Sequence, residues 1–255
     1  MHLHDWLLHA ERFAATRPAL IEGEARRTYA ETASRVRRAA AGLRGLGLQL
    51  GDRVAVAAEN GILFYEAYFA CSLAGLVAVP LNIRLSSPEI AFILEDSGSA
   101  ALLYDDACAP LAEGQTGVHL LPAAQWQAMI AASEPLTAAP HAGDQAALAH
   151  LCYTGGTTGR PKGVMLSHGN VMASATNKNV LGQFRRDDVW LHAAPMFHQA
   201  DSWACFSSTA LGARSSPLPL GHEAIHTSSL APSISRARSA TMKSPAGLGR
   251  AVSVV

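Results

Sequence analysis

The sequence is poor in charged residues and carries no excess of either sign. Of its 255 residues, 16% are charged and 49% are hydrophobic, and the formal net charge is zero. Such a composition is typical of a chain that buries a core, and it argues against a solvated or disordered polymer. It also gives no indication of a nucleic-acid partner. We interpret the densest basic cluster as the solvated face of a helix. Its members are Arg35, Arg37, Arg38 and Arg44.

Cysteines are few and widely spaced. The four are Cys71, Cys108, Cys152 and Cys205, and no two form a C-x-x-C pair. This spacing favours neither a disulfide framework nor a zinc knuckle, and it fits a reducing compartment. The N-terminus also lacks a basic region followed by an apolar core and a cleavage site. We therefore expect a cytoplasmic protein.

Long apolar runs are almost absent. The one membrane candidate is the stretch 62–81, which contains Glu66, Gly75 and Pro80. These residues favour a buried helix, a turn and a short strand over one unbroken span. We expect no transmembrane segment.

The order of apolar patterns predicts an α/β fold with mostly parallel sheets covered by helices. An opening helix, with Trp6, Leu7 and Phe13 on its apolar side, ends near Pro18. We then expect a hairpin of strands 19–21 and 27–29 and a helix with apolar residues at Val36, Ala40, Leu43 and Leu46. Strands and helices alternate over 54–57, 63–73, 76–79, 88–96 and 101–104.

In the second half of the chain we expect a surface segment followed by further strands of the core. Residues 111–145 are rich in Ala, Pro and Gly, and we interpret them as a surface excursion with one helix at 125–132. Strands are expected at 147–153, 163–166 and 189–194. Ser167 can cap a helix that continues to about Leu181.

The stretch Tyr153–Gly163 combines the residue types that bind phosphate. Glycines let backbone N–H groups approach an anion, threonines add hydroxyl donors, and lysine supplies positive charge. A flexible turn requires neither the hydroxyls nor the lysine. A Walker loop requires lysine directly after glycine, whereas Arg160 and Pro161 separate Gly159 from Lys162 here. A nucleotide polyphosphate is the expected ligand.

This stretch, YTGGTTGRPKG, resembles the phosphate loop of the adenylate-forming enzymes, which include acyl-CoA synthetases, luciferases and the adenylation domains of peptide synthetases. Residues 57–106 are similar to acyl-CoA synthetases in particular, and LSHGNV and APMFH continue the resemblance to about Arg214. The resemblance implies that residues 1–214 are an incomplete, N-terminal part of the large AMP-binding (adenylation) domain.

The resemblance also implies a reaction and its site. The family couples a carboxylic acid to ATP, releases pyrophosphate, and transfers the acyl group from the adenylate to coenzyme A. Thr154 would ligate Mg²⁺, and His198 would be a catalytic residue beside the acyl pocket and the path of the carboxylate. The β- and γ-phosphates would be held by Gly155, Gly156, Thr157, Thr158, Gly159 and Lys162. Many relatives have a hydroxyl residue in place of Gly155, so one phosphate contact is expected to be missing.

Residues 215–255 do not continue the resemblance. They contain no Phe, Trp or Tyr and a single acidic residue, Glu223. We interpret them as a non-homologous, disordered tail encoded in a shifted reading frame. His222 to His226 match the H-E-x-x-H pattern of zinc peptidases, but Pro219 and Pro232 oppose the helix that this site needs.

A chain that ends here lacks parts that the family places further on. These are the acidic magnesium partner, the ribose-binding aspartate, the adenine pocket and the C-terminal domain with its lysine. We expect an acyl-CoA synthetase that is truncated and inactive alone. The alternative is a catalytically dead nucleotide-binding or interaction module.

Overall fold

The fold consists of two sheets with helices between and around them. The computed structural model describes residues 1–140, 143–155, 160–217 and 251–252. The larger sheet has the order β6-β5-β3-β4-β7-β8, and the smaller has the order β11-β9-β10-β1-β2. In both sheets neighbouring strands are parallel, except in the antiparallel hairpins β1–β2 and β7–β8. The predicted α/β class, with mostly parallel sheets covered by helices, is confirmed.

The strands of the larger sheet are β3 (Arg53–Ala57), β4 (Val77–Pro80), β5 (Ser99–Tyr104), β6 (His119–Pro122), β7 (Leu148–Thr154) and β8 (Lys162–Ser167). Those of the smaller sheet are β1 (Pro18–Glu22), β2 (Ala25–Thr28), β9 (Val189–His192), β10 (Arg214–Pro217) and β11 (Ala251–Val252). The helices are α1 (Leu3–Ala14), α2 (Tyr29–Gly45), α3 (Ile62–Ala74), α4 (Ser87–Ser97), α5 (Ala109–Ala112), α6 (Ala123–Ala132), α7 (His168–Gly182) and α8 (Gln199–Leu211), with a 3₁₀ turn at Asp106–Cys108.

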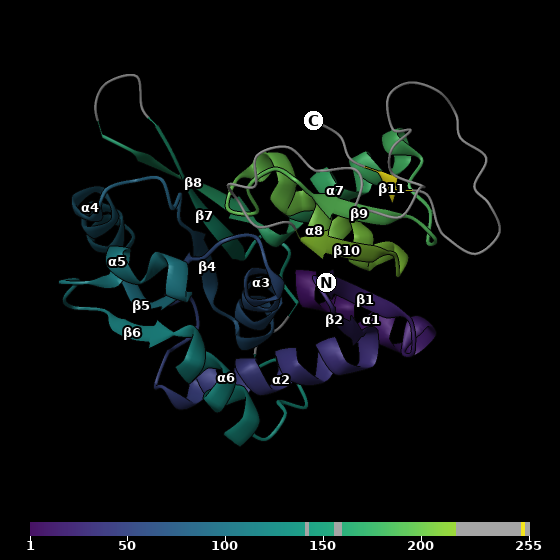
Figure 1. Cartoon of the computed structure of the whole chain (residues 1–255), viewed down its shortest axis with the longest axis horizontal. Coiled ribbons are helices and arrows are strands. Elements are labelled where there is room, and N and C mark those ends of the chain that lie inside the picture. Colours follow the sequence, from purple (N-terminus) through teal and green to yellow (C-terminus); the bar gives the residue numbers. More distant parts are fainter. Residues whose placement is uncertain (141–142, 156–159, 218–250, 253–255) are drawn as a thin grey trace.

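Both faces of the central strands of the larger sheet are buried. Val54 and Val56 of β3 face a core built with α1, α2, α3 and α8, whereas Ala55 and Ala57 face α4 and α5. This alternation follows from the two-residue period of a strand. Figure 1 shows α3 between the two sheets and α4 and α5 on the far side of the larger one. Parallel sheets with both faces covered form the expected rigid scaffold.

The helix ends follow local sequence signals. Thr28 caps α2, since its hydroxyl accepts a hydrogen bond from the Glu31 amide while the Glu31 carboxylate accepts one from the Thr28 amide. Gly75 ends α3 in the left-handed conformation, with a φ of 74°. The stretch 62–81 is therefore a helix, a turn and a strand, as predicted. No helix in the described ranges is long and apolar enough to cross a bilayer.

Several sequence expectations need correction. The predicted surface excursion contains β6, which pairs with β5, and Trp126 of α6 is fully buried. Tyr29 begins α2 instead of ending a strand, because the cap at Thr28 starts the helix there. Phe13 lies on the exposed side of α1, at 38% exposure, and contacts Arg186 instead of the core. The helix α8 was not predicted.

The basic cluster on α2 is not simply solvated. Arg35 binds the buried carboxylate of Glu66, and Arg37 forms an ion pair with Glu11. Arg38 donates to the Ser133 carbonyl and Arg44 to the Leu48 carbonyl. These side chains reach over neighbouring elements because their stems are long enough to pack while the head groups find partners.

The strand β10 continues past Arg214. Ser215 pairs with Trp190 of β9 and Leu20 of β1, and its hydroxyl lies 2.8 Å from that of Ser208. Residues 215–217 therefore belong to the sheet and not to a disordered tail, because neighbouring strands and a hydroxyl partner satisfy their polar groups. Residues 218–250, including the His222–His226 pattern, lie outside the described residues. The end of the family-like sequence stays a prediction.

Candidate functional site

The hairpin of β7 and β8 presents the predicted phosphate-binding residues. Thr154, the last residue of β7, pairs with Lys162, the first residue of β8. The hairpin thus places a threonine and a lysine opposite each other on the two strands, where the strands meet the connecting loop. Thr154, Gly155 and Lys162 are all exposed, so an anion can reach them. Gly156, Thr157, Thr158 and Gly159 lie outside the described residues.

Gly155 leaves open space at the start of the loop. A Cβ atom built on it meets no atom of the described residues within 4 Å. At Gly163, by contrast, a Cβ atom would lie 3.0 Å from Leu151 Cδ1 and 3.2 Å from Tyr153 Cζ. Gly163 therefore allows close pairing of the two strands, whereas Gly155 is not required by packing.

The helix α4 holds the hairpin at two points. The Tyr153 hydroxyl donates to Asp96 Oδ2 at 2.6 Å, and the Arg160 guanidinium lies 5.4 Å from the centre of the Phe92 ring. Burial, together with the neighbouring Asp96 carboxylate, raises the pKa of the Tyr153 phenol. The phenol therefore stays protonated and remains a donor. These contacts fix both strands as they enter the loop.

His198 lies exposed at the start of α8. Its Nδ1 accepts a hydrogen bond from the Ala200 amide at 3.1 Å, which makes His198 the N-cap of the helix. An accepting Nδ1 requires the neutral tautomer with the proton on Nε2. The imidazole can thus donate its Nε2–H to a ligand while Nδ1 accepts the hydrogen bond that caps the helix.

The phosphate hairpin and the His198 turn are neighbours. Gln199 Nε2 lies 3.0 Å from Cys152 Sγ, a contact that joins the start of α8 to the end of β7. Burial raises the pKa of the Cys152 thiol to about 11, so it stays protonated. The structure therefore brings the end of β7, which leads into the predicted phosphate loop, next to the turn that carries the predicted catalytic histidine.

Sequence reasoning missed a residue that touches this region. Asn60 follows the carboxyl end of β3, is 3% exposed, and makes hydrogen bonds to the backbone of residues 192–196. They begin at His192, where β9 ends two residues before the predicted end. A polar residue between a buried parallel strand and a helix is the signal that could have identified it.

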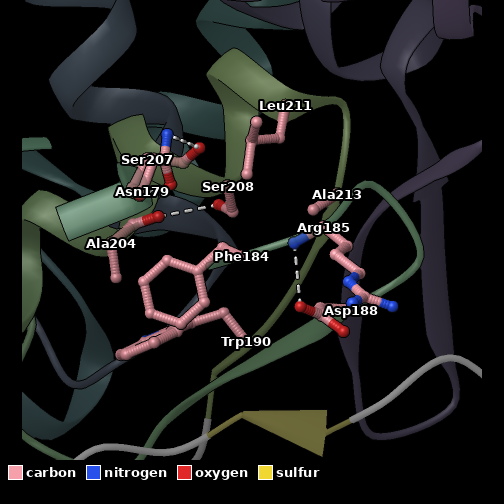
Figure 2. A pocket seen from close by; sticks show the side chains of 10 residues that line it. All are labelled: Asn179, Phe184, Arg185, Asp188, Trp190, Ala204, Ser207, Ser208, Leu211 and Ala213. Atoms are coloured by element: carbon pink, nitrogen blue, oxygen red, sulfur yellow. Dashed lines mark hydrogen bonds between the residues drawn. The ribbon is translucent and has the colours of Figure 1, made fainter. Parts of the chain in front are cut away.

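A small cavity lies apart from this site. It is surrounded by Phe184, Arg185, Asp188 and Trp190, and by residues of α7 and α8 (Figure 2). Its volume of about 10 Å³ admits at most one water molecule. The Arg185 amide donates to Asp188 Oδ2 at 2.9 Å, which tightens the turn beside it. This cavity is a packing gap and not a substrate pocket.

The predicted magnesium ligand has limited support from its surroundings. Thr154 offers one exposed hydroxyl, and the described residues contain no group of three His, Cys, Asp or Glu side chains placed to hold a metal. Mg²⁺ commonly takes one or two protein ligands and completes its shell with phosphate oxygens and water. The hydroxyl of Thr154 fits a metal ion that arrives with a nucleotide.

Comparison with known proteins gives a family match. Residues 8–242 match the model of a family described as AMP-binding enzyme. A feruloyl-CoA synthase from Amycolatopsis sp. is 39% identical over 198 residues, which are 78% of this chain and 40% of the relative. A long-chain-fatty-acid–CoA ligase from Mycobacterium tuberculosis is 35% identical over 69% of this chain and 37% of the relative. The chain therefore spans about 40% of the length of these curated relatives.

Solved structures agree with the fold. The N-terminal domain of FACL13 from Mycobacterium tuberculosis has a TM-score of 0.80 and 27% identity over 86% of this chain and 57% of that one. The o-succinylbenzoate CoA synthetase MenE from Bacillus subtilis, solved with its acyl-adenylate intermediate, has a TM-score of 0.75 and 32% identity. The alignment covers 84% of this chain and 56% of the MenE chain.

Proposed function

Because this chain belongs to the AMP-binding enzyme family, we propose that it is the N-terminal, ATP-binding part of an acid–CoA ligase. The observation that carries the proposal is the hairpin that sets Thr154 opposite Lys162 and adjoins the His198 turn through Gln199 and Cys152. The substrates of the complete enzyme are a carboxylic acid, ATP and coenzyme A. Four free, buried cysteines support a cytoplasmic location.

The proposed chemistry places ATP at the loop end of the hairpin, beside Thr154 and Lys162. Lys162 and the loop between Thr154 and Lys162 hold the β- and γ-phosphates, which spreads the charge of the leaving pyrophosphate. When bound, Mg²⁺ would neutralise phosphate charge, and the Thr154 hydroxyl is the residue here that would ligate it. The Nε2–H of His198 orients the carboxylate of the acid. The carboxylate oxygen then bonds to the α-phosphorus as the bond to the pyrophosphate oxygen breaks.

The chain by itself is expected to stop short of this reaction. It spans about 40% of the length of the curated relatives, and the resemblance assigns several required groups to the part beyond. We therefore expect Mg-ATP binding without acyl-CoA formation. Robust turnover by the purified chain would contradict this expectation.

Binding of Mg-ATP tests the proposal directly. Hydrogen exchange across residues 154–163 should slow when Mg-ATP is added. Lys162→Ala should weaken Mg-ATP binding about tenfold to a hundredfold, because a hydrogen bond to a charged group contributes about 1.5–3 kcal/mol. Lys178→Ala is the matched control, since it removes the same charge from α7, where the ammonium lies over the Trp203 ring. The absence of Mg-ATP protection in this segment would refute the assignment.

A further inference from the structure

The side chain of Asn60 is committed to a single loop. Its Nδ2 donates to the carbonyls of His192 and Ala194 at 3.0 and 2.8 Å, and its Oδ1 accepts from the Met196 amide at 2.7 Å. Both donors and the acceptor are thus used on residues 192–196. The carboxamide joins the carboxyl end of β3 in the larger sheet to that of β9 in the smaller one.

A second contact fixes the same loop from α3. The Tyr68 hydroxyl donates to the Met196 carbonyl at 2.8 Å, so that both backbone groups of Met196 are held by side chains. The Met196 side chain is fully buried. Burial raises the pKa of the Tyr68 phenol well above its usual value, which keeps it a donor. Met196 lies two residues before His198.

The start of α8 is fixed from β9. Asp201, 3% exposed, accepts from His192 Nδ1 at 2.6 Å and from Trp190 Nε1 at 3.1 Å. The turn 193–198 therefore has an anchor at each end, while His198 itself is exposed. A histidine that must meet a carboxylate at a fixed place needs such support, because its own contacts are few.

We propose that Asn60, together with Tyr68, is a positioning residue that sets the place and tautomer of His198 on the acid-binding side of the site. The inference rests on the proposed function for its meaning in catalysis. The physical claim concerns the loop: three carboxamide bonds and one phenol bond hold residues 192–196, and through them the cap at His198.

The test compares Asn60→Asp with Asn179→Asp in the 255-residue chain. An aspartate at position 60 keeps the size of the side chain but replaces both donors with an acceptor facing two carbonyls. Asn179 is the control, since its Nδ2 also donates to a main-chain carbonyl, that of Ser207, at 3.2 Å but away from the turn. Hydrogen exchange of residues 193–200 should speed up at least tenfold in Asn60→Asp and less than twofold in Asn179→Asp.

The ¹⁵N shifts of the His198 ring supply a readout that general destabilisation does not move. The native chain should show an Nε2–H tautomer with Nδ1 as acceptor, and Asn60→Asp should show a mixture of tautomers. Tyr68→Phe removes one bond and should change exchange and tautomer in the same direction by a smaller amount. If Asn60→Asp does not fold, the Tyr68→Phe variant still tests the proposal.

Two results would overturn the inference. One is an unchanged His198 tautomer in a folded Asn60→Asp or Tyr68→Phe variant, and the other is equal loosening of residues 193–200 in the Asn179→Asp control. Mg-ATP affinity is measured in parallel and should change less than twofold in the Asn179→Asp control. Failure of Mg-ATP to bind the native chain would count against the proposed function alone, because exchange and tautomer are read without nucleotide.

Discussion

At the scale of single residues, Gly155 offers a gain of function. In the part of the chain that the structure describes, nothing lies within 4 Å of a Cβ atom built there, so these residues leave room for a serine. Gly155→Ser should tighten Mg-ATP binding about twofold to tenfold, because one added hydrogen bond contributes about 0.5–1.5 kcal/mol. Calorimetric titration measures the affinity, and Gly155→Ala separates the hydroxyl from the stiffer backbone. Equal affinity of the serine and alanine variants would exclude a new phosphate contact.

His150 should make stability depend on pH. Its ring is fully buried between those of Tyr68 and Phe206, at centroid distances of 4.8 and 5.4 Å, and neither nitrogen has a partner in the described part of the chain. Burial lowers its pKa from 6.5 to about 3. The folded state therefore stays neutral over a range in which the unfolded chain binds a proton.

The sign of the effect follows from proton linkage. The contribution of the neutral His150 ring to the free energy of unfolding is fully present above pH 6.5. It is lost as the pH falls toward 3, at about 1.4 kcal/mol per pH unit for one proton. Denaturant unfolding between pH 7.5 and 4.5 should show this slope. His150→Phe should remove it, whereas substitution of the exposed His9 with Gln should leave it unchanged. A slope that persists in His150→Phe would assign the pH dependence to other groups.

At the scale of elements, one buried carboxylate joins several segments. Glu66 of α3 has no exposed surface and accepts from Arg27 of β2 and from Arg35 of α2, whose Nε lies 2.6 Å away. Arg35 also donates to Gln127 of α6 at 2.6 Å. Removing the Glu66 carboxylate leaves two partly buried guanidinium groups, with side chains 25% and 24% exposed, without this partner.

Glu66→Gln should therefore lower the free energy of unfolding by about 3–5 kcal/mol. Denaturant unfolding measures it, with Glu24→Gln as the control because Glu24 is exposed in the turn between β1 and β2. A loss of less than about 1 kcal/mol would mean that water or a relaxed geometry replaces the lost interaction.

The sequence predicted elements that have strong local signals and missed those that depend on distant partners. The alternation from β3 to β5 was predicted from its apolar patterns, and in the structure Gly75 and Gly98 end the two helices between these strands. The short β6 has no such pattern and exists because β5 offers a free edge. Six of the 13 residues of α8 are Ser, Thr, Asp or Gln, and Ser208 and Thr209 bond back to the carbonyls of Ala204 and Cys205.

The same distinction applies to the site. Thr154, Gly155 and Lys162 were found because the residue types of the loop are contiguous in sequence. Asn60 was missed because its partners lie more than 130 residues away. A tertiary contact of that kind leaves no periodic pattern in the sequence.

At the scale of the whole molecule, the smaller sheet needs β10, which ends at residue 217, to join its first strand to β9. The first strand, β1, pairs with β10, and the Tyr29 hydroxyl donates to the Ala213 carbonyl at 2.5 Å. The larger sheet, in contrast, ends at β8, which pairs only with β7 among the described strands. Val164 and Met165 of β8 are 42% and 69% exposed. An exposed apolar edge strand is a site of association between copies of a chain.

We therefore expect the isolated chain to aggregate through β8. Met165→Lys should lower the rate of aggregation several-fold, because a charge on an edge strand opposes edge-to-edge pairing. Leu50→Lys is the matched control: Leu50 is 51% exposed but lies in a turn, so the same charge is added without changing a strand edge. Light scattering at several concentrations measures the rate. If both variants slow aggregation equally, the effect comes from net charge. The edge strand β8 is then not where copies of the chain associate.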